Sequence, residues 1–531
     1  PTLRRQRQMC IRDRLRIDPK TNIGSRVTYY NNVKIRNLKN QKSEITQVKG
    51  LPKNPKLSNI SWSPDQKRIA LTNTTETGVE LWVLELENGS VTKLTESNLN
   101  SNIGSVINWF SDSENMLVKM ISNNRRPLID TNKIVPDGPT ISTNFGEKAQ
   151  NRTYQDLLKN KFDEHNFEQL STSTIYKVSI DGIAKKWMDD GMYRTISFSP
   201  NGEYVMISQI NKPFSYLVTY SRFPTETNIY NKDGDFVSNL QKVPLIEELP
   251  KGFMSVRTGK RSFSWRPDKA ASLTYVTALD SGDPSKKVDF RDEVYELNYP
   301  FSGKGKFILK TINRFSGIDW GTKDMAIAYD TWWNTRNRKS YVFNPSNPNI
   351  KPKIISDRNY QDTYSDPGSF LRSRNEFNRS VLKMHYGNIF LRGQGFSPSG
   401  QFPFIDKVNT KTFEKTRVYQ SSYTDKIESI IDYDPKKNQL TVSIESPSEY
   451  PNYYTKKVKS GKLEKLTNLK NPFLELQNVK KEKITYLRND GVELSGILYL
   501  PLNYDKEKKE KMPMILWAYP REFKDLSLIH I

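Results

Sequence analysis

The chain has 531 residues, of which 35% are hydrophobic, and its formal net charge of +23 comes from 82 lysines and arginines against 59 acidic residues. A chain of this length is too long for one small core, so several domains or one large repeat domain are expected. The single cysteine, Cys10, excludes a disulfide framework and a cysteine-ligated metal site. No run of 18 apolar residues is present, so we expect no membrane span.

The two ends of the chain differ from the pattern between them. Residues 1–14 carry five arginines without any periodicity, and residues 526–531 follow a strongly patterned segment abruptly. We expect both stretches to be non-native sequence and the chain to be a truncated fragment. The compartment then stays unknown: a soluble chain is expected, and a periplasmic or secreted location is open if an export signal was lost at the N-terminus.

The excess of positive charge is spread along the whole chain. Lysines stand at expected strand ends and turns with acidic residues among them, as in residues 456–465, and no arginine-rich helix or nucleic-acid motif accompanies them. This distribution favours a solvated basic surface and predicts no nucleic-acid partner. A nucleic-acid function would instead predict salt-sensitive retention on DNA.

A strand–turn–strand unit recurs along the sequence. Each copy has an aromatic residue near the end of an alternating strand, then a turn such as Pro-Asp, and then a second apolar strand, which is typical of hairpins. A further hairpin often follows, as in residues 81–95, and three or four short strands per unit predict the blades of a β-propeller. The anchor aromatics of the units are Trp62, Trp109, Phe198, Trp265, Trp320 and Tyr433.

The spacing of the anchors predicts seven blades. Successive anchors lie 47, 89, 67, 55 and 113 residues apart, against roughly 40 to 50 residues per blade in common propellers. An undetected blade near residues 381–391 fits the longest interval, and an insertion at about 123–172 fits the second longest. Inside the insertion, Tyr154, Leu157, Leu158 and Phe162 have helical spacing and predict a short helix, which either guards an opening or packs on the surface.

The sequence pattern changes at Lys480, where we expect a new domain to begin. Residues 484–501 predict a hairpin with an Asn-Asp-Gly turn. After a lysine-rich loop, residues 513–520 are continuously apolar, as expected for a strand that is buried on both faces.

Few residues in the chain have the chemistry of a catalytic centre. The three histidines, His165, His385 and His530, do not pair at ligand spacing, so no metal is predicted. No Gly-x-Ser-x-Gly nucleophile elbow occurs. The nearest match, residues 395–400, has Ser399 at the fifth position, where the motif requires glycine, and is interpreted as a propeller loop. No nucleotide-binding motif is present, so we expect no cofactor.

The Trp-Ser-Pro-Asp repeats, with Asp490-Gly-Val-Glu-Leu-Ser-Gly-Ile-Leu-Tyr-Leu-Pro and Pro513-Met-Ile-Leu-Trp-Ala-Tyr-Pro, resemble the propeller-to-hydrolase junction of the prolyl oligopeptidase family. Four further segments resemble its glutamyl endopeptidase-like branch: residues 15–22, 152–159, 261–270 and 364–369. The resemblance covers about residues 15–525.

This resemblance implies an all-β chain with a seven-bladed β-propeller at 15–479; whether its N-terminal blade is complete is left open. The first strands of a truncated α/β-hydrolase domain are expected to follow at 480–525. It implies a serine-type endopeptidase that acts on peptide or protein substrates, acidic ones included, through Ser-Asp-His chemistry in the intact protein. None of the triad lies in this chain, so the chain alone is expected to be inactive.

The resemblance also points to two residues near the expected third hydrolase strand. Tyr519 stands where relatives place a tyrosine whose hydroxyl stabilises the oxyanion, although Tyr-Pro-Arg replaces their Tyr-Gly-Gly. Packing at the strand end is the alternative role for this tyrosine. Arg521 is a candidate for binding a substrate carboxylate.

A different class of function is a non-catalytic β-propeller that binds proteins or glycans. In that case residues 480–525 would be a C-terminal appendage. A binding propeller has no need of a hairpin followed by a fully apolar strand, whereas a hydrolase domain begins in this way.

Overall fold

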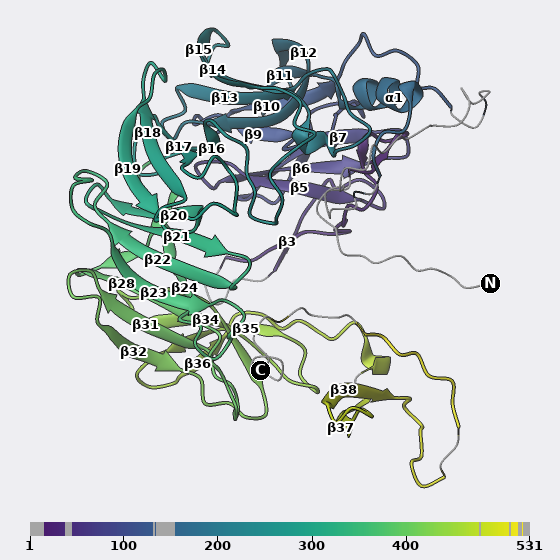
Figure 1. Ribbon diagram of the computed structural model, residues 1–531. Coiled ribbons are helices and arrows are strands. Elements are labelled where there is room, and N and C mark those ends of the chain that lie inside the picture. The colour runs from purple at the N-terminus through teal and green to yellow at the C-terminus, as the bar shows by residue number, and fades with distance from the viewer. Residues whose placement is uncertain are drawn as a thin grey trace. The chain divides into compact units, whose positions relative to one another are not determined.

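The computed structural model describes residues 15–37, 45–130, 133, 154, 156–476, 479–508, 511–518 and 523. Regular structure in these residues is almost entirely antiparallel β-strand, with one α-helix and short 3-10 turns (Figure 1). The predicted all-β class is confirmed. No helix in the described ranges has the length and hydropathy needed to cross a bilayer.

The chain forms two compact units. The first contains the described residues up to Trp333 together with Lys339–Ile354 and Arg374–Val381. The second contains Asn334–Arg338, Ile355–Ser373 and the described residues from Leu382 onward.

Five antiparallel sheets have the size of a single propeller blade, four with four strands and one with five. The first is β5 (Leu57–Trp62), β6 (Arg68–Thr74), β7 (Val79–Glu85) and β8 (Val91–Lys93). The second is β16 (Arg261–Trp265), β17 (Ser272–Ala278), β18 (Asp292–Asn298) and β19 (Lys306–Thr311). The third is β20 (Arg314–Thr322), β21 (Met325–Trp332), β22 (Asn337–Phe343) and β23 (Lys353–Asn359).

The other two blade-sized sheets belong to the second unit. The five-stranded one is β24 (Ser369–Phe370), β27 (Met384–His385), β28 (Asn388–Gly393), β31 (Phe404–Asn409) and β32 (Lys415–Gln420). The last is β33 (Ile427–Asp434), β34 (Gln439–Glu445), β35 (Asn452–Lys457) and β36 (Leu463–Lys465). Sheets built from neighbouring strands in this way form a β-propeller arrangement.

A larger, seven-stranded sheet lies between the first two blades in the sequence. Its strands are β9 (Ile107–Trp109), β10 (Asn115–Ile121), β11 (Ser173–Ser179), β12 (Ala184–Phe198), β13 (Tyr204–Ile210), β14 (Thr225–Asn231) and β15 (Phe236–Val243). The 15-residue strand β12 joins two meanders, because its first half pairs with β11 and its second half with β13. The prediction of seven separate blades is therefore wrong: five separate blades form, and one long strand fuses the intervening strands into a single sheet.

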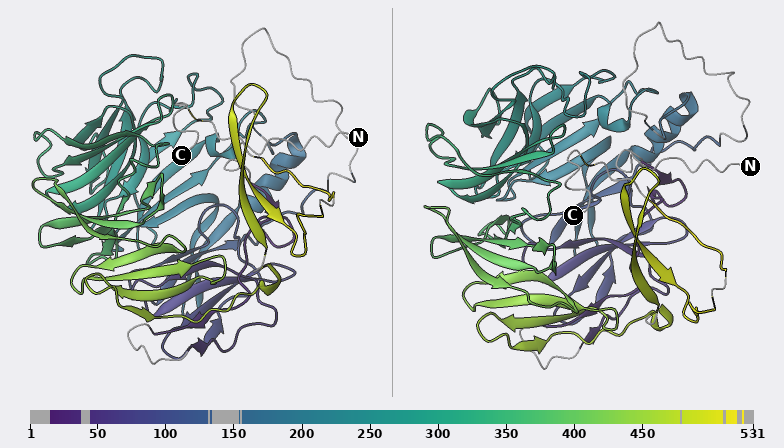
Figure 2. Two further views of the ribbon diagram at one scale, coloured as in Figure 1. Left: turned by 90° about the horizontal axis from the view of Figure 1, so that it is seen from below. Right: turned by 60° about the horizontal axis from the view of Figure 1, so that its bottom comes forward.

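Five two-stranded ribbons complete the strand inventory of the described residues. They are β1 (Ile17–Asp18) with β2 (Ile23–Gly24), β3 (Lys34–Ile35) with β4 (Thr46–Gln47), β25 (Arg372–Arg374) with β26 (Ser380–Leu382), β29 (Phe396–Ser397) with β30 (Gly400–Gln401), and β37 (Lys480–Leu487) with β38 (Glu493–Leu500). Figure 2 shows β37 and β38 as a separate ribbon in yellow. Its turn contains Gly491 at φ 80°, so the predicted Asn-Asp-Gly hairpin is confirmed.

The insertion contains helix α1 (Lys161–Ser171), which begins later than predicted. Asn160 caps it, because its side-chain oxygen accepts hydrogen bonds from the amides of Phe162 and Asp163. Phe167 is buried and packs edge-on against Phe214 and Phe223 at 5.1 and 5.7 Å. The helix therefore packs against the β13–β14 connection, which supports the surface-packing interpretation of the insertion.

The apolar cores lie between consecutive sheets. One layer joins residues of β6 and β7 to Trp109, Met116 and Val118 of the seven-stranded sheet. Another joins Met206 and Ile229 to residues of β16–β18, and a third lies between β17–β19 and β20–β22. Five of the six anchor aromatics are buried in or beside such layers, whereas Trp62 is 56% exposed.

Lys119 of β10 lies on the strand next to the β9 edge of the seven-stranded sheet and is 1% exposed. Its ammonium group donates a hydrogen bond to the carbonyl of Ile103. Burial lowers the pKa of Lys119 to about 7, because the charged form is poorly solvated there.

We predict that Lys119→Met raises the free energy of unfolding more at pH 6.5 than at pH 9.5. Between pH 7 and the ordinary lysine pKa, the unfolded chain binds more protons than the folded chain, so the free energy of unfolding rises with pH in that window. Below pH 7 Lys119 is charged in both states, and there it destabilises the folded chain most. Urea unfolding at both pH values measures the difference. Lys185→Met, at an exposed position of β12, is the control and should show no pH-dependent gain; an equal gain for Lys119→Met at both pH values would contradict the prediction.

Candidate functional site

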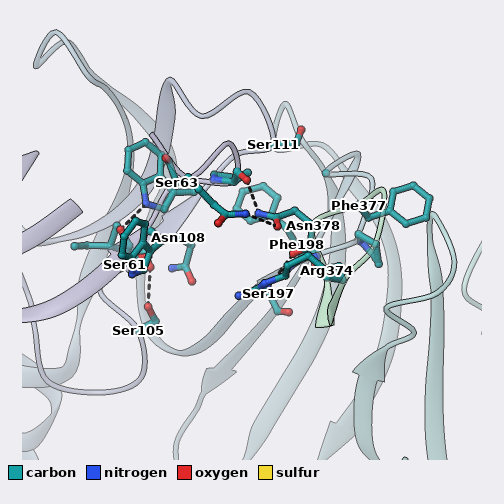
Figure 3. Close-up of a pocket in the computed structure, with 18 of the residues that line it drawn as sticks. Ser61, Ser63, Ser105, Asn108, Ser111, Ser197, Phe198, Arg374, Phe377 and Asn378 are labelled. Atoms are coloured by element: carbon teal, nitrogen blue, oxygen red, sulfur yellow. Dashed lines mark hydrogen bonds between the residues drawn. The ribbon is translucent and has the colours of Figure 1, made fainter. Parts of the chain in front are cut away.

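A cavity of about 630 Å³ lies in the first unit, beside the turns that follow the anchor residues Trp62, Trp109 and Phe198. We call it the turn cavity. Serine and asparagine side chains from β5, β9 and β12 and from the adjoining turns line it, and residues 374–379 close one side (Figure 3). Pockets of this volume hold small organic ligands or short peptide segments.

The repeated Pro-Asp and Pro-Asn turns are built in the same way. Ser63 donates to Asp65 at 2.6 Å, and Ser199 donates to Asn201 at 2.7 Å. Each hydroxyl also accepts from the amide of the residue that opens the next strand, Arg68 or Tyr204, at 2.9 and 3.0 Å. The side chains thus satisfy backbone groups that the turn leaves unpaired.

Indole hydrogen bonds tie the inner strands of neighbouring sheets together. Nε1 of Trp109 donates to the carbonyl of Ser61 at 3.2 Å, and Nε1 of Trp265 donates to the carbonyl of Ser197 at 2.9 Å. In each pair the acceptor directly precedes the anchor aromatic of another unit: Ser61 precedes Trp62, and Ser197 precedes Phe198. These bonds place the strands that form two walls of the turn cavity.

Residues 374–379, which we call the bridging segment, connect three turns across the cavity. Asn378 donates to the carbonyl of Pro64, and Asn375 donates to the carbonyl of Pro267 at 2.7 Å. Arg379 donates to the carbonyls of Phe198 and Ser199 at 3.1 and 3.0 Å. The bridging segment is therefore fastened to turns that lie up to 314 residues away in the sequence.

The turn cavity carries positive charge. Its lining contains two arginines, Arg374 and Arg379, and no acidic residue. Burial, and then the charge of Arg374, lower the pKa of Arg379. The lining holds no histidine, lysine or cysteine, so the cavity has groups for binding but no general base.

Both residues that the sequence marked as candidates, Tyr519 and Arg521, lie outside the described residues. Residues 511–518 before them do not form a strand, and Ile515 is 96% exposed. In the described residues no sheet or helix covers this run, so the strand buried on both faces stays a prediction for the complete domain.

The other candidates from the sequence have structural roles. Nε2 of His165 on α1 donates to the carbonyl of Pro127 at 2.9 Å, so this half-buried ring ties the start of the insertion to the helix within it. His385 lies on β27. Ser397 belongs to the short β29–β30 hairpin and contacts Ser399 and the carbonyl of Gly400, which confirms the loop interpretation of residues 395–400.

Sequence reasoning missed the bridging segment altogether. Its residues Asn375, Asn378 and Arg379 follow no repeat, and their partners are distant in the sequence. The only available signal was the length of the interval between Trp320 and Tyr433, which was assigned to an undetected blade.

No family model matches the chain. Two curated proteins resemble it over almost its whole length. Probable glutamyl endopeptidase, chloroplastic, of Oryza sativa subsp. japonica is 32% identical over 538 residues, which are 96% of this chain and 57% of that protein. The protein of the same name from Arabidopsis thaliana is 32% identical over 543 residues, which are 96% of this chain and 56% of that protein.

Both relatives are named probable glutamyl endopeptidases, which confirms the resemblance found in the sequence. The chain spans about 57% of the length of the first of these relatives.

Two solved peptidase structures that match this chain have low sequence identity to it. A prolyl endopeptidase is 12% identical with a TM-score of 0.44, covering 85% of this chain and 55% of its own. Oligopeptidase B from Leishmania major is 7% identical with a TM-score of 0.44, covering 86% and 54%.

We predict that the double variant Asn375→Ala/Asn378→Ala loosens the bridging segment. Each lost amide hydrogen bond should cost about 1 kcal/mol of local stability, so amides in Arg374–Val381 should exchange faster with deuterium. Mass spectrometry of peptides from this segment measures the change. Asn388→Ala, whose amide donates only within its own turn, is the control; unchanged exchange in the double variant would show that these bonds do not hold the segment.

Proposed function

We propose that this chain is the propeller portion of a serine-type endopeptidase that acts on peptides or proteins. The observation that carries the proposal is the 32% identity to two proteins named probable glutamyl endopeptidases, which extends over 96% of the chain. The catalytic serine, aspartate and histidine would lie in a part of the protein that this chain does not contain, since the chain has no Gly-x-Ser-x-Gly sequence.

In such an enzyme the serine attacks the scissile carbonyl and forms an acyl-enzyme. The histidine first accepts the serine proton and then donates it to the leaving amine, while the aspartate orients the imidazole. Water then releases the acyl group by the reverse sequence of proton transfers. The propeller portion would contribute peptide-binding surface rather than reacting groups.

The exposed apolar side chains after residue 480 support a hydrolase domain that begins there. Leu516 and Trp517 are 80% and 83% exposed, and Ile497 of β38 is 63% exposed. Exposed apolar side chains in such numbers are expected where another part of a protein covers them. We propose that residues 480–525 begin an α/β-hydrolase domain and that the run at 513–518 becomes one of its buried strands.

Tyr519 and Arg521 keep their proposed roles in that domain. The Tyr519 hydroxyl would donate to the oxyanion of the tetrahedral intermediate, and a donor of this kind can lower the barrier by about 3 kcal/mol. Arg521 would bind the carboxylate of a glutamate on the substrate through its two parallel N–H groups.

The proposal predicts that a protein extended to the full length of the relatives reacts with a serine-directed fluorophosphonate and cleaves peptides. The chain of 531 residues should neither be labelled nor turn over peptides, because the nucleophile is missing. Labelling followed by mass spectrometry identifies the modified serine. A labelled serine within residues 15–525 would overturn the proposal, and an unlabelled full-length protein that binds peptides would favour the non-catalytic binding module.

In the full-length protein, Arg521→Ala should reduce kcat/KM for cleavage after glutamate by about tenfold or more relative to cleavage after glutamine. The loss of a charge-assisted bidentate pair accounts for this difference. Competition between matched Glu and Gln peptides measures the ratio directly. Arg488→Ala, which removes an exposed arginine paired with Asp490, serves as the control, and an unchanged ratio in Arg521→Ala would remove Arg521 from the specificity site.

A further inference from the structure

The two arginines of the turn cavity, exposed Arg374 and half-buried Arg379, differ in their partners from the buried arginines Arg266 and Arg314 of the first unit. Arg266 forms ion pairs with Asp268 and Glu296 at 2.7 and 3.0 Å. Arg314 forms ion pairs with Asp280 and Asp292 at 2.7 and 3.1 Å. These two buried guanidinium groups therefore have carboxylate partners, which offset the cost of desolvating their charge.

Arg374 and Arg379 have no such partner in the described residues. Arg379 donates to two backbone carbonyls, and Arg374 donates to the carbonyl of Asn378 at 2.9 Å. Glu376 lies between them in the sequence but is exposed and does not line the cavity. Two like charges beside one cavity repel each other, and an anion between them would relieve the repulsion.

The opposite wall supplies neutral hydrogen-bonding groups. Ser61, Ser105 and Asn108 lie across the cavity from Ser197 and Arg374 (Figure 3). The Nδ2 group of Asn108 is buried without an acceptor in the described structure. Trp62, which is 56% exposed, adds an aromatic surface to the same lining.

We propose that the turn cavity is a binding site for a peptide carboxylate, with Arg374 as its main cationic contact. The arginines pair with the carboxylate, the serine and asparagine groups bind the peptide backbone, and the Trp62 ring covers the adjacent side chain. A glutamate or aspartate side chain and a peptide C-terminus carry the same group. The site goes beyond the proposed peptidase activity and does not depend on it, since binding needs no nucleophile.

Titration of the 531-residue chain with a tetraglutamate peptide capped at both ends tests the proposal, with calorimetry and tryptophan fluorescence as readouts. A capped tetraglutamine peptide is the matched ligand without charge, and an uncapped tetraglutamine peptide offers only the terminal carboxylate. The tetraglutamate peptide or the uncapped peptide should bind at least about tenfold more tightly than the capped tetraglutamine peptide, as a charge-assisted pair predicts. Which of the two binds identifies the source of the carboxylate.

Variants locate the site. Arg374→Gln should weaken binding of the preferred peptide by about tenfold, and Trp62→Phe should remove the fluorescence change. Lys67→Gln removes the same charge from the neighbouring turn at an exposed position outside the cavity and should change the affinity less than about twofold. Circular dichroism checks that each variant is folded, and Arg374→Lys, which keeps the charge but loses the planar fork, should bind with intermediate affinity.

Three results would overturn the proposal. The first is equal affinity for charged and uncharged peptides. The second is equal weakening by Arg374→Gln and Lys67→Gln, because this would indicate only the overall positive field. The third is that inorganic phosphate displaces the bound peptide at the same concentration as added free peptide does. This would make the cavity a general anion site.

Discussion

The hydrogen bond from an anchor indole to the preceding inner strand is the constraint on which the first unit depends. A buried indole N–H without an acceptor is costly, so each tryptophan fixes the distance between its own strand and the carbonyl that it reaches. Trp109 and Trp265 reach carbonyls at equivalent positions, one residue before the anchors Trp62 and Phe198. The spacing of the inner strands, and with it the width of the turn cavity, follows from this repeated contact.

The remaining anchors use other chemistry at the same place. The ring of Trp320 lies 4.0 Å from the guanidinium of Arg266. Arg266 follows the anchor Trp265 at the position where Ser63 follows Trp62, and this cation–π contact helps to stabilise its buried charge. Phe198 has no donor, and its ring instead contacts Phe110 at 4.7 Å. The repeat therefore conserves a position for an aromatic ring, while the partner of the ring changes from sheet to sheet.

The sequence predicted local structure well because period-two alternation and Pro-Asp turns act over a few residues. The strands at each anchor, the turns closed by Ser63 and Ser199, and the β37–β38 hairpin all follow from such patterns. The number of separate blades did not, because the continuation of β12 through two meanders depends on how the strand pairs on either side. The bridging segment was also out of reach: Asn378 and Arg379 bond to carbonyls 314 and 181 residues away, and no local pattern encodes such partners.

The described structure leaves two kinds of surface without a complement, and they differ in chemistry. The run at 511–518 is apolar, so only the burial of its side chains against other apolar groups can stabilise it, and this attraction is not directional. The turn cavity is polar and cationic, with its donors fixed by hydrogen bonds to the anchor turns, so it favours a ligand whose acceptors match their geometry. The two surfaces therefore need complements of different chemistry: apolar side chains for residues 511–518, and an acceptor of negative charge for the cavity, which is the basis of the carboxylate site proposed there.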